Sequence, residues 1–476
     1  MSANLRFTLI KSVINFCKKL LNQSSEQTHD FSSGPLVFER DQHPVSRQLI
    51  SNNALKVLYR LNKGGYDAYL VGGGVRDILL GHAPKDFDIV TNATPEQIKG
   101  LFRNCRLIGR RFRLAHIVFG RDIIEVATFR GHHDEKSNNK KISKQSDQGM
   151  LLRDNIYGTI DEDAERRDFT INALYYSAVD YKVYDFAGGV ADIENRTIRL
   201  IGDPETRYRE DPARMLRAIR FATKLDMDIE HSTRAPIKPL ASLLGNIPAA
   251  RMFEEFLKLF VSGKAVANFH ELRAYDLFEH FFPSVERGLT GNDNFSAQDI
   301  ELAEQFIVQA LENTDIRLAN EQRVTPAFLF AALLWFPLQK RIEMVKASQD
   351  IAAQDAFFQA YHELMSEQQQ SVAIPKRFQL PIKDIWILQE RFEKRDPKRA
   401  FKTLEHPKFR AGYDFLLLRA QFGDSEVQEL AKWWTEFQEA SPSTQSQMLK
   451  ATGTRAKPRR KLRRKKRPNN KAKSEA

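Results

Sequence analysis

Two aspartates, Asp86 and Asp88, have the type and the spacing expected of metal ligands. They lie in the segment DFDIV, which we predict to be a strand over residues 86–90. Side chains two apart on a strand project from one face, about 6.6 Å apart along the chain, and carboxylate oxygens are ligands that Mg²⁺ prefers. An isolated pair of this kind is usually a solvated strand end. Here the pair follows a glycine turn and an arginine, so we expect it to bind two magnesium ions.

The glycine turn lies in LVGGGVRDILLG, residues 70–81, between a predicted strand (67–71) and a short helix (75–80). Gly72 and Gly73 allow the backbone to approach a bound group closely and leave helix N–H groups pointing at it, which suits a phosphate. Arg76 adds positive charge. The glycines are contiguous and no GK[ST] follows, so the turn is neither a Walker A loop nor a dinucleotide fingerprint.

Glu125 is a third candidate carboxylate. It lies in IIEVA, residues 123–127, within a predicted strand of otherwise apolar residues. A carboxylate in such a strand is costly unless it is paired or ligating. Two interpretations are equally supported: Glu125 completes a three-carboxylate metal site, or it forms a structural ion pair with an arginine such as Arg130.

Two arginine-rich segments supply further candidates: RRDFTINAL at 166–174 and REDPARMLRAIRF at 209–221. In the second, a predicted helix over 213–225 brings its arginines, three residues apart, to one side. Such a row implies anionic neighbours, whether a triphosphate, RNA or carboxylates. Asp211 also suits a helix cap. The candidates from both segments are Arg166, Arg167, Asp168, Asp211, Arg214 and Arg217.

Strands and helices must hold these residues in place, and their order predicts an α+β protein. A helix from residue 53 to Gly64 precedes the first strand, and a capping box at Thr94 begins another. A hairpin is expected over 116–119 and 123–128, and a last strand over 183–186. Residues 131–150 are expected to form a loop, and from 211 to 434 the periodic segments are helical. The fold is therefore a small mixed sheet with helices, followed by an extended all-α neck and body.

Positive charge is concentrated at the C-terminus. The chain carries +12, and residues 451–476 contain twelve Lys and Arg against one Glu, which leaves +1 for the first 450 residues. A tail of this composition cannot bury enough surface to fold, and its expected ligand is a phosphate backbone. A second basic cluster lies inside the fold, at residues 99–113, and is expected to face phosphates. The RNA-binding candidates are Arg110, Arg111, Arg113, Arg459, Arg460, Arg463 and Arg464.

The N-terminal residues have a helical apolar period rather than a signal-peptide core, and residues 23–47 are polar and predicted to be a linker. The longest apolar run is too short to span a bilayer, and two cysteines fit a reducing cytoplasm. An N-terminal amphipathic helix docking on the protein itself is favoured over one lying on a membrane. The expected segments are 1–50, helix and linker; 51–200, head; 201–270, neck; 271–450, body; and 451–476, basic arm.

The motifs GGGVRD, DFD, RRDFTINAL and EDPARMLRAIRFA, in this order, resemble the tRNA nucleotidyltransferase/poly(A) polymerase family of the polymerase-beta superfamily. The resemblance runs from about residue 50 to 270. It implies a polymerase-beta-like head in which Asp86 and Asp88 bind catalytic magnesium. It also implies that Arg166, Arg167 and Asp168 lie against the sugar and phosphates of the nucleotide. Asp211 and Arg214 would face the edge of the incoming base.

Residues 107–117 resemble a segment that marks the bacterial poly(A) polymerases of this family. The resemblance therefore implies template-independent transfer of AMP from ATP to RNA 3′ ends, with Mg²⁺, by a monomer. An RNA chaperone or a degradation complex is a further candidate partner. A CCA-adding enzyme and a non-catalytic RNA-binding adaptor are the alternatives. The third essential carboxylate stays open between Glu125 and Asp168, and Asp168 is slightly favoured for its arginine neighbours.

Overall fold

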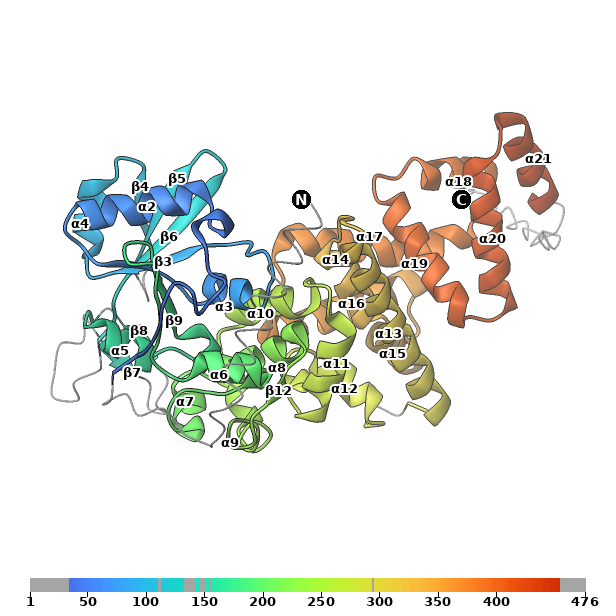
Figure 1. The fold of residues 1–476 in the computed structure, drawn as a ribbon. Coiled ribbons are helices and arrows are strands. Elements are labelled where there is room, and N and C mark those ends of the chain that lie inside the picture. The colour runs from blue at the N-terminus through green and yellow to red at the C-terminus, as the bar shows by residue number, and fades with distance from the viewer. Residues whose placement is uncertain are drawn as a thin grey trace, which may run out of the picture. The chain divides into compact units, whose positions relative to one another are not determined.

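A computed structural model of the chain describes residues 34–109, 113–131, 143–145, 151–154, 156–292 and 295–453 (Figure 1). The chain divides into two compact units. The first contains the residues up to 294 together with 311–323 and 337–374. The second contains residues 295–310 and 324–336 and the chain from 375 onward.

An eight-stranded mixed sheet forms the head of the first unit, in the order β1-β10-β9-β2-β3-β6-β5-β4. Only β3 and β6 are parallel neighbours, and the other pairs in this sheet are antiparallel. The strands are β1 (Leu36–Phe38), β2 (Ala68–Val71), β3 (Asp88–Thr91), β4 (Cys105–Ile108), β5 (Leu114–Phe119), β6 (Asp122–Thr128), β9 (Leu174–Ser177) and β10 (Val183–Asp185). A separate pair joins β7 (Ser143–Gln145) and β8 (Leu151–Asp154).

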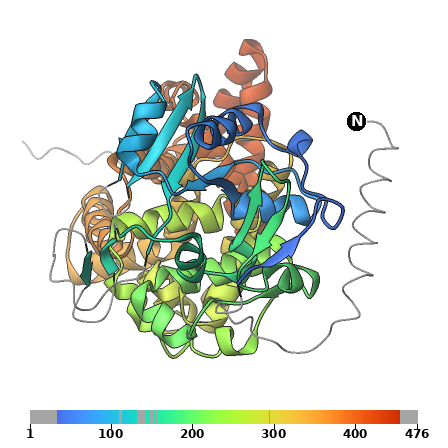
Figure 2. The ribbon, with the colours of Figure 1, turned by 60° about the vertical axis from the view of Figure 1, so that its left-hand side comes forward.

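Helices cover both faces of this sheet. Helix α2 (Asn52–Lys63) is capped by the Ser51 side chain, and α4 (Pro95–Leu101) begins with the capping box of Thr94. Both lie on one face, as Figures 1 and 2 show. Helix α2 buries an apolar stripe against the sheet. On the other face, Ala164 of α5 (Ile160–Glu165) packs with Val90 of β3 in an apolar cluster.

The other elements of the first unit are helices and a parallel two-stranded pair. The elements are α3 (Gly73–Leu79), η2 (Arg47–Leu49), η3 (Thr170–Asn172), α6 (Gly189–Glu194), β11 (Thr197–Ile198), α7 (Pro204–Glu210), α8 (Ala213–Leu225), β12 (Asp228–Ile229), α9 (His231–Arg234), η4 (Ala241–Asn246), α10 (Ala249–Phe260), α11 (Ala265–Ala274), η5 (Phe278–His280), α12 (Pro283–Leu289) and α16 (Ala353–Ser371). Buried phenylalanines of α10, α11 and η5 form edge-to-face pairs, which fixes how these helices pack.

The second unit is helical and has a core of its own. Trp434 is fully buried among Phe392, Phe409 and Phe437, and its indole N–H donates to the Phe392 carbonyl. Its helices are α14 (Pro326–Leu333), α17 (Lys376–Glu393), α18 (Pro397–Leu404), α19 (Phe409–Phe422), α20 (Ser425–Glu439) and α21 (Pro442–Gly453), while α13 (Ala297–Ala319) and α15 (Trp335–Ser348) contribute residues to both units. In the described part of the chain, no helix is long and apolar enough to cross a membrane.

The predicted fold class is confirmed, with three local corrections. The predicted strand over 86–90 begins only at Asp88, so Asp86 precedes it. The segment 23–47, predicted as a linker, contains β1, which pairs with β10 through backbone hydrogen bonds that a polar composition does not reveal. The predicted loop over 131–150 contains β7. The predicted N-terminal helix and basic arm lie outside the described residues.

Candidate active site

Two candidate carboxylates lie side by side where β3 and β6 run in parallel. Asp88 is the first residue of β3 and is paired in register with Glu125 of β6. Asp86 lies two residues before Asp88 in the chain. On the next strand, His116 of β5 is paired with Glu125, and its Nε2 atom lies 3.1 Å from Glu125 Oε1. Because paired residues share a sheet face, Asp88, Glu125 and His116 form a row across it.

Repulsion among the carboxylates of Asp86, Asp88 and Glu125 favours the binding of a cation. The Asp88 side chain is open to solvent at the strand end. Its pKa is nevertheless raised to about 6, first by the loss of hydration among surrounding protein atoms and then by the negative charges of Glu125 and Asp86, while Arg167 lowers it. Bound Mg²⁺ would relieve this repulsion, so the donor set fits a divalent cation. Within the described ranges, no three His, Cys, Asp or Glu side chains already converge at ligand distance.

The glycine turn lies beside two arginines. Gly72 has φ +69° and ψ −129°, a conformation that L side chains rarely adopt. A Cβ atom built on Gly72 would lie 3.6 Å from Nη1 of Arg167, and one on Gly73 would lie 3.5 Å from Nη2 of Arg76. The turn therefore places backbone N–H groups and two guanidinium groups in one region, as a phosphate site requires.

Buried partners hold both arginines of the RRD segment. Arg167 donates from Nε to the Tyr175 hydroxyl at 2.7 Å and from Nη2 to Asp163 at 2.9 Å. Burial lowers the pKa of Arg167, but Tyr175 and Asp163 outweigh it and raise that pKa above its ordinary value. Arg166 donates to the carbonyl of Gly131. Both guanidinium groups are therefore held in a fixed orientation.

Asp168 has a different environment from the other carboxylates. It is buried and accepts hydrogen bonds from the Phe169 N–H at 2.9 Å, from Asn172 at 3.1 Å and from Arg217 Nε at 2.5 Å. Burial alone would raise the pKa of Asp168, but Arg217 and these donors lower it to about 2. Asn172 in turn accepts from Arg76 Nη1 at 2.7 Å. Asp168 thus belongs to a chain of contacts that links α3 to α8.

The remaining base-edge candidates are also fixed by partners. Arg214 donates to Glu210 Oε2 at 2.8 Å, and Arg207 donates to the same atom at 2.9 Å. Asp211 accepts from Arg251 of α10 at 2.8 Å. These pairs orient the side chains before any nucleotide arrives, which favours a rigid binding site.

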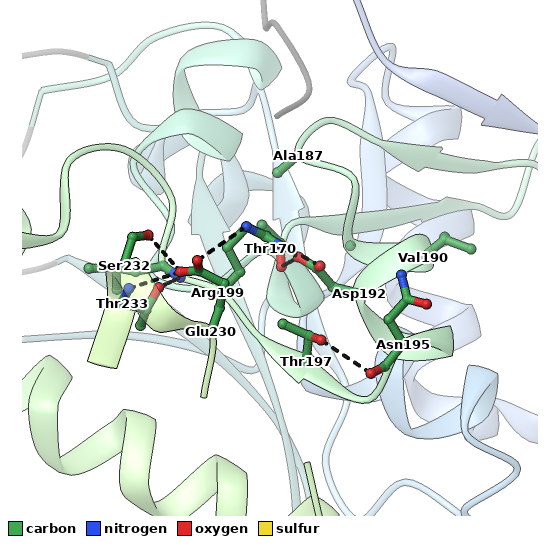
Figure 3. A network of polar contacts seen from close by, with 12 residues as sticks. Thr170, Ala187, Val190, Asp192, Asn195, Thr197, Arg199, Glu230, Ser232 and Thr233 are labelled. Carbon is green, nitrogen blue, oxygen red and sulfur yellow. Dashed lines mark hydrogen bonds and ion pairs between the residues drawn. The ribbon is translucent and has the colours of Figure 1, made fainter. Parts of the chain in front are cut away.

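A polar network includes Thr170, which follows the RRD segment in the chain (Figure 3). Asp192 of α6 accepts from the Thr170 hydroxyl at 2.6 Å and from Arg199 Nε at 3.2 Å. Glu230 accepts from the Thr233 N–H at 2.9 Å. The Thr170 N–H also donates to the Arg199 carbonyl at 3.0 Å. Thr170, two residues after Asp168, is thereby tied to α6 and to Arg199.

The structure therefore gathers the predicted carboxylates, glycines and arginines in the first unit. Arg113 is exposed and pairs with Glu96 at 2.6 Å, whereas Arg110, Arg111, Arg459, Arg460, Arg463 and Arg464 lie outside the described residues. Sequence reasoning missed His116 and Arg251. The strand register across the hairpin could have placed His116 beside Glu125, but no local pattern links Arg251 to Asp211.

Three family models match the chain. The poly A polymerase head domain matches residues 68–199, the probable RNA and SrmB binding site of polymerase A matches 226–289, and the polymerase A arginine-rich C-terminus matches 349–468. Poly(A) polymerase I of Salmonella typhimurium is 53% identical, and the match covers 94% of this chain and 96% of that protein. The chain belongs to the poly(A) polymerase I family. It is therefore a nucleotidyltransferase, as the sequence motifs predicted.

Other relatives bear on the CCA-adding alternative. Poly(A) polymerase I of Haemophilus influenzae is 48% identical over 90% of this chain and 93% of its own. The CCA-adding enzyme of Lactobacillus helveticus is 37% identical, but that match covers 47% of this chain and 52% of the enzyme. The Thermotoga maritima CCA-adding enzyme complexed with tRNA_CCA shares the fold, with a TM-score of 0.53 at 19% identity over 85% of this chain and 87% of its own. The poly(A) polymerase interpretation is thus the better supported.

Proposed function

We propose that this chain transfers AMP from ATP to the 3′-hydroxyl of RNA without a template and releases pyrophosphate. The observation that carries the proposal is the match to poly(A) polymerase I over 94% of the chain. A CCA-adding activity would require the same carboxylates, and it is favoured only by relatives that match about half of the chain. A non-catalytic adaptor is disfavoured because each carboxylate that the motifs imply is present.

Asp86 and Asp88 would hold Mg²⁺, and we expect two ions. Bound metal would supply a lowered pKa for the attacking 3′-hydroxyl and charge neutralisation for the departing pyrophosphate. The protein's own contribution is to fix the reacting groups and to present positive charge where negative charge develops.

We assign the third metal-facing carboxylate to Glu125 rather than to Asp168. Glu125 is paired in register with Asp88, and its side chain is 48% exposed and therefore accessible to a cation. Asp168 is buried and already accepts three hydrogen bonds, one of them from Arg217. Its role is then to position Arg217 for the nucleotide, which reverses the slight preference drawn from sequence.

The nucleotide would bind between the glycine turn and α8. The turn and the RRD arginines suit the triphosphate, and α8 with the residue before it suits the base. The residues proposed to contact the nucleotide or to hold those that do are Gly72, Gly73, Arg76, Arg166, Arg167, Asp211, Arg214 and Arg217. Arg76 acts through Asn172, since its guanidinium donates to that side chain and to Asp77.

RNA contacts beyond the 3′ end are assigned to the basic segments, Arg110, Arg111, Arg113, Arg459, Arg460, Arg463 and Arg464. We keep the proposed division into head, neck, body and arm. We further propose a monomer that acts in the cytoplasm on mRNA and other RNA 3′ ends, with a chaperone or a degradation complex as a candidate protein partner.

Substitution of the carboxylates tests the mechanism. Asp88→Asn and Glu125→Gln should each lower AMP transfer at least a hundredfold, because a metal ligand is lost, while the thermal midpoint stays within a few degrees. The assay is incorporation of labelled ATP into an RNA with a free 3′-hydroxyl. Phe401→Ala, an exposed residue of the second unit, serves as the control. Activity retained in both carboxylate variants would end this mechanism.

A further inference from the structure

A basic groove lies on the head between α2 and the end of α4, and the nucleotidyl transfer described above does not use it. It has a volume of about 740 Å³. Lys56, Arg60 and Lys63 line it together with Tyr59 and Phe102. No aspartate or glutamate is among the described residues that form its wall.

The three cations of the groove form a regular row. They stand at positions i, i+4 and i+7 of α2, which places them on one side of the helix with rises of about 6 and 10 Å from the first. All three are exposed. Among the described residues, no carboxylate pairs with them, and Lys56 donates only to the neutral amide of Asn53 at 3.5 Å. Their charge is therefore available to a polyanion.

An aromatic ring stands within this row. Tyr59 is 40% exposed, and its hydroxyl accepts from Arg47 Nη1 at 3.2 Å. The Arg60 guanidinium lies 5.2 Å from the centroid of the Phe102 ring, which is a cation–π contact. Aromatic rings among cations are the platform on which the bases of single-stranded nucleic acids stack.

The groove opens on the sheet face opposite the carboxylates. Phe119, which lines the groove, is paired with Asp122, three residues before Glu125 on the same strand. Successive strand residues alternate between faces, so Phe119 and Glu125 project in opposite directions. A ligand in the groove therefore cannot be the nucleotide or the 3′-terminal residue at the transfer site.

A second cavity, of about 480 Å³ at α12, shows what distinguishes the groove. Arg273 and Arg287 line that cavity, but Arg273 pairs with Glu286 at 3.0 Å and Arg287 pairs with Glu367 at 2.7 Å. Its positive charges are therefore compensated within the fold. The groove on the head combines an exposed aromatic ring with cations that pair with no carboxylate of the described chain, and this combination favours RNA over an acidic protein segment.

We propose that this groove, lined by Lys56, Tyr59, Arg60 and Lys63, binds single-stranded RNA upstream of the 3′ end that is being extended. The inference rests on the proposed function for the identity of the polyanion. Cations would contact the phosphates, and one base would stack on Tyr59. RNA long enough to pass around the sheet edge would occupy both faces, whereas a short oligonucleotide would occupy only the transfer site.

The test is the affinity of the full chain for a labelled 20-nucleotide RNA with a blocked 3′ end, measured without ATP by fluorescence anisotropy across a range of salt concentrations. The triple variant Lys56→Gln, Arg60→Gln, Lys63→Gln should weaken binding about tenfold or more at low salt. The slope of log affinity against log salt should become shallower by about 2, because each phosphate that the protein neutralises on a single strand contributes roughly 0.7 to it. Tyr59→Ala should weaken binding without changing that slope. Tyr59→Phe keeps the aromatic ring and should bind RNA as tightly as the wild type.

The matched control is Lys182→Gln, Lys238→Gln, Lys394→Gln, which removes the same charge from lysines that already pair with carboxylates. Unchanged affinity and slope in the groove variant, or an equal loss in the control, would overturn the proposal. AMP transfer to a five-nucleotide RNA is measured separately and should be unchanged in the groove variant. Absence of transfer in the wild-type chain would instead refute the proposed function.

Discussion

Removing the Asp168 carboxylate should lower the free energy of unfolding and not only the rate of AMP transfer. Asp168 is 10% exposed and has a pKa of about 2, against 3.8 for an ordinary aspartate. Nearly two pKa units at 1.36 kcal/mol each correspond to about 2 kcal/mol of unfolding free energy. Asp168→Asn also leaves Arg217 without its carboxylate, which raises the expected loss to about 2–4 kcal/mol. The thermal midpoint should fall by about 2–5 °C, because a chain of this length has a large unfolding entropy.

The pH dependence of this loss follows from the sign of the shift. Because the folded-state pKa lies below the unfolded value, the stabilisation by Asp168 is present above about pH 4 and is lost as the pH falls toward 2. The difference between wild type and Asp168→Asn should therefore be constant from pH 5 to 8. Circular dichroism melts across that range measure it.

A double-variant cycle separates the pair from its surroundings. Asp168→Asn combined with Arg217→Gln should lose less stability than the sum of the two single variants, by about 1 kcal/mol or more. Each single variant leaves one charge unpaired, whereas the double variant leaves none. Strictly additive losses, or a midpoint unchanged in Asp168→Asn, would refute the assignment of Asp168 to a positioning role.

Two further substitutions test other parts of the site, and a third tests the half-buried carboxyl group of Glu194 in α6. Glu125→Gln should lower the unfolding free energy by less than about 1 kcal/mol, since the Glu125 side chain is 48% exposed, while AMP transfer falls strongly. Equal losses of both would argue against a metal role. Gly72→Ala should cost about 1–3 kcal/mol of backbone strain and raise the KM for ATP, as steady-state kinetics and thermal melts would show; an unchanged KM would remove the turn from the nucleotide site. Burial raises the pKa of Glu194 to about 7, so any stability that this group contributes is present below about pH 4.5 and lost as the pH rises through 7. Glu194→Gln should therefore raise the thermal midpoint at pH 8 and leave it nearly unchanged at pH 4.5, and a pH-independent difference would contradict the shift.

Local sequence signals predicted the elements that hold the site. The apolar stripe of α2, the capping box at Thr94 and the glycine turn each reflect interactions among residues close in the chain, and the structure has these elements at the predicted places. Asp86 and Asp88 could be named for the same reason, since the pair closely follows the glycine turn and Arg76 in the sequence. The start of β3 was placed two residues early because strand ends depend on neighbouring strands.

Long-range partners could not be predicted in this way. The pairing of β3 with β6 decides that Glu125 stands beside Asp88, and no pattern within either strand encodes that register. Likewise Asp168 and Arg217 are 49 residues apart, and their ion pair depends on how α8 packs against the head. Strand β1 was missed because it is short and lies in a polar segment that resembles a linker. Only its pairing with β10, which is distant in the sequence, makes it a strand.

The most direct test of the central claim is to supply each nucleoside triphosphate separately. The full chain is incubated with Mg²⁺ and a generic RNA ending in a free 3′-hydroxyl, and product lengths are read on a denaturing gel. The account predicts long ladders with ATP and little extension with CTP. A short, fixed extension that needs both CTP and ATP, and that occurs only on tRNA, would contradict it and make the chain a CCA-adding enzyme.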